Sequence, residues 1–245
     1  MRLFIISLAF LLLFVSSVFA GLTFNIESGI VTSSYNDVQI PKETGTLFSL
    51  TDDLKLSSKE FYRINVVYNW NEKNFLQLLY APLTLNSEGY APYDISYNET
   101  LFSKDDYLYA KYRFDSYRLT YRRTFFKGTN YTIGLGLTGK IRDAAIEVRN
   151  GTLTSEKTNT GFVPLINFKI DYFLSRKISA RLEGDALVGP QGRAEDIFAG
   201  INYRINKQLS IFGGYRMLEG GADVDSVYNF TFLHYASLGV IIKVL

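Results

Sequence analysis

The chain contains no cysteine, one histidine, one tryptophan and only five prolines in 245 residues. Its fold therefore cannot depend on disulfides, and the proline content is too low for a linker-rich or disordered protein. The formal net charge of +2 gives no basic footprint for nucleic acid. Aromatic residues are abundant instead, with 18 Tyr and 19 Phe, and both types favour β-strands.

One long apolar run is present, and it lies at the N-terminus. Arg2 precedes an apolar stretch from Leu3 to Val15, and small residues stand one and three positions before a cut after Ala20. This arrangement predicts a secretory signal peptide over residues 1–20. The alternative, an N-terminal membrane anchor, is disfavoured because the run is short and no stop-transfer charges follow it.

Beyond residue 20 no apolar run is long enough to form a spanning helix. An exported, hydrophobic chain of this kind is either a secreted soluble β-protein or a membrane β-barrel. The remaining sequence alternates apolar and polar residues, which predicts strands. Ten segments show this alternation: 22–30, 61–69, 75–83, 116–125, 131–142, 162–173, 179–189, 196–205, 209–217 and 228–244.

The connections between these segments fall into two length classes. Residues 69–73, 126–130, 174–177 and 204–208 form short polar connections, whereas 33–58, 86–110, 150–158, 189–195 and 219–227 form longer ones. Short turns at one end and longer loops at the other are typical of an outer-membrane barrel. We therefore predict a ten-stranded antiparallel transmembrane β-barrel over residues 21–245. An eight-stranded barrel, with 61–69 and 75–83 as a loop hairpin, is the alternative.

Aromatic residues cluster where strands meet turns, as at Tyr68, Trp70, Phe125–Phe126, Tyr172–Phe173 and Tyr203. Such clusters are typical of the aromatic girdles of membrane barrels. The chain resembles the small bacterial outer-membrane β-barrels as a class. The resemblance implies export to the outer membrane, periplasmic termini, contact with outer-membrane lipids and lipopolysaccharide, and insertion by the barrel-insertion machinery. The chain departs from the class at its end, where Val244 and Leu245 replace the usual terminal aromatic residue.

In a barrel the polar parity of each strand faces the lumen. The predicted lumen charges are Glu27, Arg63, Arg118, Arg122, Lys140, Arg142, Lys169, Asp171, Arg181, Glu183, Asp185, Asp196, Arg204 and Arg216. Charges of both signs can pair and fill a narrow barrel. Because basic residues outnumber acidic ones, a continuous water path would instead favour small anions.

One segment interrupts its own alternation. Lys140 and Arg142 share their parity with Ile146 and Val148, so the apolar and charged residues fall on one face. A β-bulge near Asp143–Ala145 would restore the pattern, and we predict one there.

The single histidine, His234, is the weak candidate for catalysis, with Ser237 as a nucleophile. Lipid A deacylases and outer-membrane phospholipases carry His-x-Ser, and omptin-type proteases carry Asp-x-His; the sequence LHYASLG meets neither pattern. On a regular strand His234 faces lipid and Ser237 the opposite side, which predicts an irregularity between Phe232 and Ala236.

Asp223 and Asp225 lie in the last outer connection and are weak candidates for a Ca²⁺ site. An exposed acidic turn is the simpler interpretation, and nothing in the sequence predicts a cofactor. The leading functional hypothesis is a non-enzymatic barrel with a charge-filled lumen and a structural or surface-interaction role. The alternatives are a narrow anion-preferring pore and a lipid-modifying hydrolase that uses His234. The oligomeric state stays open.

Overall fold

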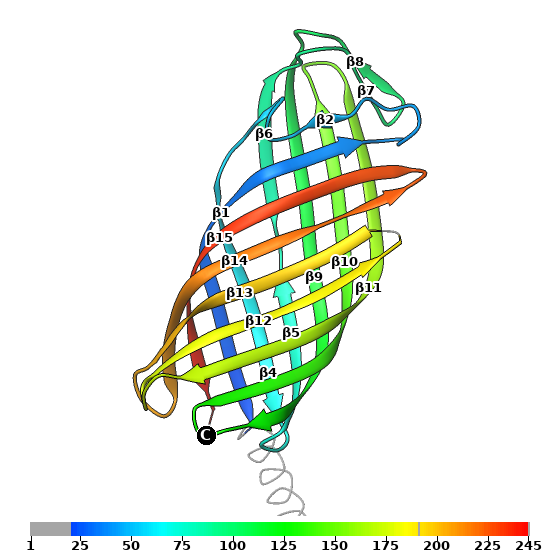
Figure 1. Ribbon diagram of the computed structural model, residues 1–245. Coiled ribbons are helices and arrows are strands. Elements are labelled where there is room, and N and C mark those ends of the chain that lie inside the picture. The colour runs from blue at the N-terminus through cyan, green and yellow to red at the C-terminus, as the bar shows by residue number, and fades with distance from the viewer. Residues whose placement is uncertain (1–20, 191, 245) are drawn as a thin grey trace, which may run out of the picture.

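The protein is described by a computed structural model that covers residues 21–190 and 192–244. The predicted signal peptide, residues 1–20, lies outside the described residues. Ten antiparallel strands close into a barrel, in which the first strand of the wall pairs with the last (Figure 1). No helix of the described chain is both long and apolar enough to cross a membrane.

The barrel wall uses every strand segment that the alternation predicts. The wall strands are β1 (Leu22–Gln39), β4 (Lys59–Asn69), β5 (Asn74–Ala81), β9 (Tyr107–Lys127), β10 (Tyr131–Arg149), β11 (Thr154–Phe173), β12 (Ile178–Gly189), β13 (Gly192–Arg204), β14 (Leu209–Val224) and β15 (Val227–Lys243). Past a break at residues 82–83, β6 (Thr84–Tyr90) continues β5 along β9. The ten-stranded prediction is confirmed, and the eight-stranded alternative is not needed because β4 and β5 both belong to the wall.

Four short strands lie in the outer connections and not in the wall. They are β2 (Phe48–Ser49), β3 (Lys55–Leu56), β7 (Ile95–Tyr97) and β8 (Thr100–Phe102). Together with their flanking residues they form two long connections, 40–58 and 91–106, at the outer end of the barrel (Figure 1). We call these two connections the loop cap.

The other three outer connections are much shorter than the sequence predicts. Strand pairing in β10–β11, β12–β13 and β14–β15 continues to residues 149/154, 189/192 and 224/227. The expected loops at 150–158, 189–195 and 219–227 are therefore mostly strand. Alternation could not reveal these extensions, because a paired strand that projects beyond the lipid has no apolar face to maintain.

The predicted bulge at Asp143–Ala145 is wrong. Strand β10 keeps one register with both neighbours from Gly134 to Arg149, and its shift lies at Ile133/Gly134. Ile146 and Val148 therefore face inward like Lys140, and both are buried. They can do so because the interior itself becomes apolar toward the outer end.

This outer part of the interior is a hydrophobic core built between the wall and the loop cap. The wall contributes residues such as Val31, Leu108, Tyr112, Val148 and Leu233, all buried. The cap contributes Phe48, Leu50, Leu54, Ile95, Tyr97 and Phe102 to the same cluster. The barrel is thus apolar inside at its outer end, whereas most of the charged interior residues lie below it, beside a small apolar cluster of Phe198, Phe212 and Ile241.

Candidate functional site

A cluster of buried ion pairs crosses the middle of the interior. Arg216 on β14 donates from Nε and Nη2 to the two carboxylate oxygens of Glu27 on β1, both at 2.8 Å. Its Nη1 donates to Asp196 on β13 at 2.6 Å. These strands alternate in sequence, so the guanidinium and both carboxylates point inward and bridge three strands of the wall.

Two further arginines reach the Asp196 carboxylate from the other side of the barrel. Arg63 on β4 and Arg118 on β9 lie 2.8 and 2.6 Å from Asp196, and Arg118 also binds Asp185 on β12 at 2.7 Å. Asp185 in addition accepts hydrogen bonds from Thr138 and Asn167. We call Glu27, Arg63, Arg118, Asp185, Asp196 and Arg216 the ion-pair belt. All six are buried, and Asp196 is only 3% exposed.

A second charged cluster lies nearer the inner end. Arg181 donates to Asp171 at 2.9 Å, and the Lys169 ammonium lies 3.3 Å from Glu183. These residues belong to the facing strands β11 and β12, whose register sets Asp171 opposite Arg181 and Lys169 opposite Glu183. The three charges of segment 179–189 therefore all have partners inside the barrel.

The predicted excess of basic lumen residues can now be located. Five basic residues pair with five acidic ones in the two clusters: Arg63, Arg118, Arg216, Lys169 and Arg181 with Glu27, Asp185, Asp196, Asp171 and Glu183. Of the rest, Arg122 contacts the Asn167 side chain at 3.3 Å, and Arg142 binds Asn159. Arg204 is exposed at the end of β13, and Lys140 is buried.

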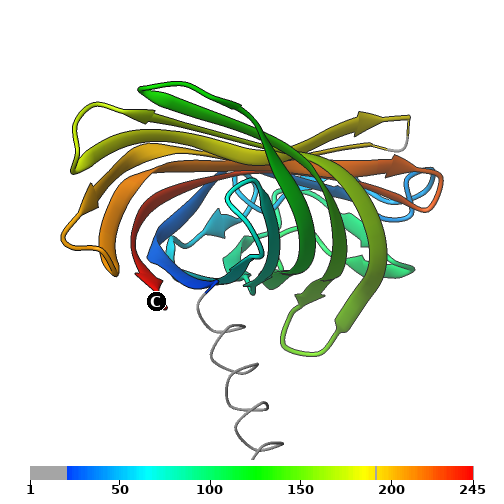
Figure 2. The same cartoon turned by 90° about the horizontal axis from the view of Figure 1, so that it is seen from below.

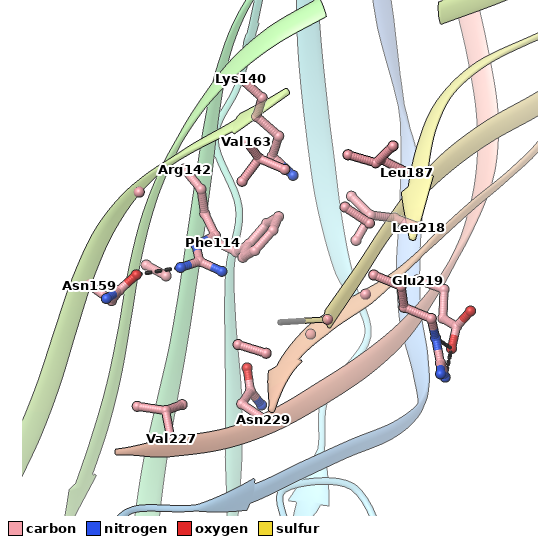
Figure 3. Close-up of a pocket in the computed structure, with 18 of the residues that line it drawn as sticks. Phe114, Lys140, Arg142, Asn159, Val163, Leu187, Leu218, Glu219, Val227 and Asn229 are labelled. Atoms are coloured by element: carbon pink, nitrogen blue, oxygen red, sulfur yellow. Dashed lines mark hydrogen bonds and ion pairs between the residues drawn. The ribbon is translucent and has the colours of Figure 1, made fainter. Parts of the chain in front are cut away.

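Beside the ion-pair belt the interior opens into a cavity of about 510 Å³ (Figure 3). Its polar lining includes Lys140, Arg142 and Asn159, and its apolar lining includes Phe114, Val163, Leu165, Leu187 and Leu218. Belt residues Arg118, Asp185 and Asp196 also contribute to its surface. We call this cavity the side pocket.

The side pocket lies where neighbouring wall strands separate. Along β11, residues 154–165 pair with β10, whereas β12 pairs only with Ile166–Phe173. Within the described residues no strand pairs with the other edge of 154–165. Viewed from below, the outer part of β11 and the β12–β13 hairpin point in different directions (Figure 2). The backbone of the wall is therefore unpaired between β11 and β12 beside the pocket, which Pro164 and Gly189 line from the two sides, and we call this break in the pairing the lateral opening.

Comparison with solved structures identifies the type of barrel. The outer membrane protease OmpT from Escherichia coli superposes with a TM-score of 0.57 over 91% of this chain and 96% of that chain, at 8% identity. The fold is that of bacterial outer-membrane β-barrels. Weaker similarities include the translocator domain of NalP from Neisseria meningitidis (TM-score 0.44, 12% identity, 91% and 88% of the chains) and Ail from Yersinia pestis (0.38, 8%, 90% and 98%). No protein-family model and no curated protein sequence matches the chain.

His234 lies on the outward face of this outer-membrane barrel, and Ser237 lies inside it. The Ser237 hydroxyl donates to Glu27 at 2.8 Å, so the two candidate catalytic residues are on opposite sides of β15. The His234 ring instead contacts the Ser34 hydroxyl through Nε2 and the Tyr215 hydroxyl through Nδ1, the latter at 2.5 Å. Among residues 21–190 and 192–244 no carboxylate hydrogen-bonds the ring, so the contacts do not complete a triad with an orienting acid.

The irregularity near His234 lies on the neighbouring strand and not on its own. Strand β15 keeps its pairing with β14 throughout, whereas β1 shifts register between Ser33 and Tyr35. The extra residue in that shift is Ser34, which the bulge turns toward the His234 ring. The predicted irregularity between Phe232 and Ala236 is therefore wrong.

The acidic candidates for a metal site are not gathered together. Asp223 forms an ion pair with Lys42 of the loop cap at 2.5 Å. In the part of the chain that the structure describes, no group of three or more His, Cys, Asp or Glu side chains could hold a metal ion.

Proposed function

We propose that the protein is an integral outer-membrane barrel that is closed to ion flow and has a non-enzymatic, structural or surface-interaction role. The outward face of the wall supports a location in the membrane. Large apolar side chains point outward along the strands, among them Leu137, Phe162 and Leu238, each about 70% exposed. Toward the outer end of the barrel, beyond this apolar band, charged residues occupy outward positions. Arg113 and Asp143, for example, form an ion pair there at 2.5 Å. This change of character is expected where a barrel leaves the lipid.

The observation that carries the proposal is the binding of Asp196 by three arginines from three different strands. Arg63 and Arg118 reach it across the interior and Arg216 reaches it from the adjacent strand, so the belt links distant parts of the wall at that level. A narrow pore would need these side chains to separate. Breaking such a pair leaves an uncompensated buried charge, which costs about 3–5 kcal/mol.

The loop cap supports closure at a second level. The Tyr97 hydroxyl donates to the carbonyl of Ile146 at 2.7 Å, and the Tyr97 ring packs edge-on against Phe48. Tyr93 donates to Asp53 at 2.8 Å and so joins the two connections. Partial burial and this hydrogen bond raise the pKa of Tyr93 to about 12, so its hydroxyl remains a donor even in moderately alkaline solution.

Planar-bilayer recording tests the closure. The wild-type protein is expected to give no conductance steps. Replacing residues 94–104 by a short Gly-Ser linker removes the cap closure, and the double variant Arg118→Ala/Asp196→Ala weakens the belt. Each change alone is expected to give no conductance steps, and the combination of the two changes is expected to conduct ions.

Each variant must first be shown to be folded, by circular dichroism and by the shift in gel mobility between unheated and boiled samples. Regular steps from the wild-type protein would overturn the proposal in favour of the pore. Steps from the cap variant alone would show that the belt does not close the barrel.

A further inference from the structure

We propose that the side pocket binds an anionic amphiphile, which enters from the membrane through the lateral opening beside β11. Its acid group meets Lys140 and Arg142, and its hydrocarbon chain lies along the apolar lining. The proposal concerns a ligand site in the wall and adds to the closed-barrel function.

Lys140 is the first reason to expect an acid group. Its side chain is 4% exposed and lines the pocket (Figure 3). Within residues 21–190 and 192–244 no carboxylate lies within ion-pairing distance of Lys140, and its Nζ sits 4.6 Å from the centre of the Phe114 ring. A buried ammonium without a counter-ion is costly, so an anion in the pocket would be stabilised.

Arg142 adds a second donor on the same face. It lies two residues beyond Lys140 on β10, so both side chains point into the pocket. Its Nη2 donates to Asn159, whereas its Nε is buried and has no partner among the described residues. Of the four carboxylates that line the pocket, Asp185 and Asp196 are bound by the belt arginines and Glu219 by Arg193, so Glu195 is the one without an ion pair to a described residue.

The rest of the pocket suits a hydrocarbon chain. Val163, Leu165 and Leu187 line it from β11 and β12, and Phe114 and Leu218 line it from β9 and β14. The volume of about 510 Å³ is in the range of small-molecule sites. A cationic group at one part of a predominantly apolar cavity fits a ligand with one acid group and a long apolar tail.

The lateral opening lies at the depth where such a ligand would arrive. Phe162 on β11 is 71% exposed and pairs with Ile141, directly below the outward Asp143 that marks the end of the apolar band. Across the opening, Val188 on β12 also faces outward and is exposed. An amphiphile in the outer leaflet holds its acid group at this interface and its chain below it.

Displacement of a fluorescent probe tests the proposal. The full barrel in nanodiscs of dioleoylphosphatidylcholine is titrated with dansyl-labelled undecanoic acid, which is then displaced by palmitate, by lysophosphatidic acid or by hexadecanol. Both acids are expected to displace the probe at concentrations at least about tenfold below those needed for the alcohol, since charge-assisted hydrogen bonds are worth about 1.5–3 kcal/mol. The more effective acid distinguishes a carboxylate from a phosphate headgroup.

Three variants locate the site. Lys140→Met is expected to weaken probe binding by about tenfold or more, and Val163→Trp is expected to abolish it by filling the cavity. The matched control Lys111→Met removes an exposed lysine from β9 and is expected to bind as the wild type does.

Two results would overturn the proposal. One is a folded Val163→Trp barrel that binds the probe normally; the other is equal displacement by the alcohol and the acids. Neither result depends on the folding of Lys140→Met. Wild-type binding by a folded Lys140→Met barrel would likewise contradict the assigned position of the acid group.

Discussion

Arg216 shows how single residues hold the interior together. One guanidinium satisfies two buried carboxylates, Glu27 with paired hydrogen bonds and Asp196 with a third. Lys140 illustrates the opposite case, since it is buried near the belt and no carboxylate of residues 21–190 and 192–244 lies within ion-pairing distance of it. The same barrel therefore contains charges that stabilise the wall and a charge that is free to bind a ligand.

Replacing Arg216 by Met is expected to lower the free energy of unfolding by about 3–5 kcal/mol, because buried Glu27 loses its paired hydrogen bonds and Asp196 loses one of its three arginines. Urea unfolding in lipid vesicles measures the change. Lys127→Met is the control, since its pair with Glu72 is highly exposed and exposed pairs contribute little. Equal effects of the two substitutions would refute the structural role of the belt.

At the scale of elements, the loop cap behaves as part of the core. Its short β7–β8 hairpin turns at Asn98 and Glu99, both with positive φ, which is the backbone of a tight two-residue hairpin. The turn directs Tyr97 and Phe102 into the barrel, where both are completely buried. The cap is thus fixed by packing and not only by its hydrogen bonds to the wall.

Phe102→Ala is expected to loosen the cap, because truncating a buried phenylalanine costs about 3–5 kcal/mol. Limited proteolysis of the folded barrel should then cut within 91–106 faster than in the wild type. The neighbouring Leu101 is 59% exposed, so Leu101→Ala should leave the rate of cleavage unchanged. Unchanged cleavage of both variants would mean that the cap does not depend on this packing.

The sequence predicts the wall far better than it predicts the cap or the pocket. Alternation identifies each strand because lipid and lumen impose opposite polarity on its two faces. The cap follows no such period, since Phe48, Leu54 and Tyr97 meet only after the chain has folded over the barrel. One signal for the lateral opening was present: Pro164 interrupts an apparent central strand, and proline in a sheet is confined to edges and bulges.

For the whole molecule, the two ends of the barrel differ in construction. The inner end has short turns and both chain ends of the wall, Leu22 and Lys243 (Figure 1). The outer end has the cap, the long hairpins and the lateral opening. The proposed membrane orientation therefore places the loop cap at the cell surface and the lateral opening at the level of the outer leaflet.

The chain contains no cysteine, so this orientation can be tested with introduced cysteines that are the only thiols of the protein. Gly151→Cys places a thiol in the β10–β11 turn, where an added Cβ meets no atom within 4 Å, and Lys207→Cys places one in the exposed β13–β14 turn. A membrane-impermeant maleimide added to intact cells is expected to label the cysteine at 151 but not the one at 207. Permeabilising the outer membrane should make both reactive. Labelling of the cysteine at 207 alone in intact cells would show that the barrel has the opposite orientation. The cap, the lateral opening and the side pocket would then lie on the periplasmic side.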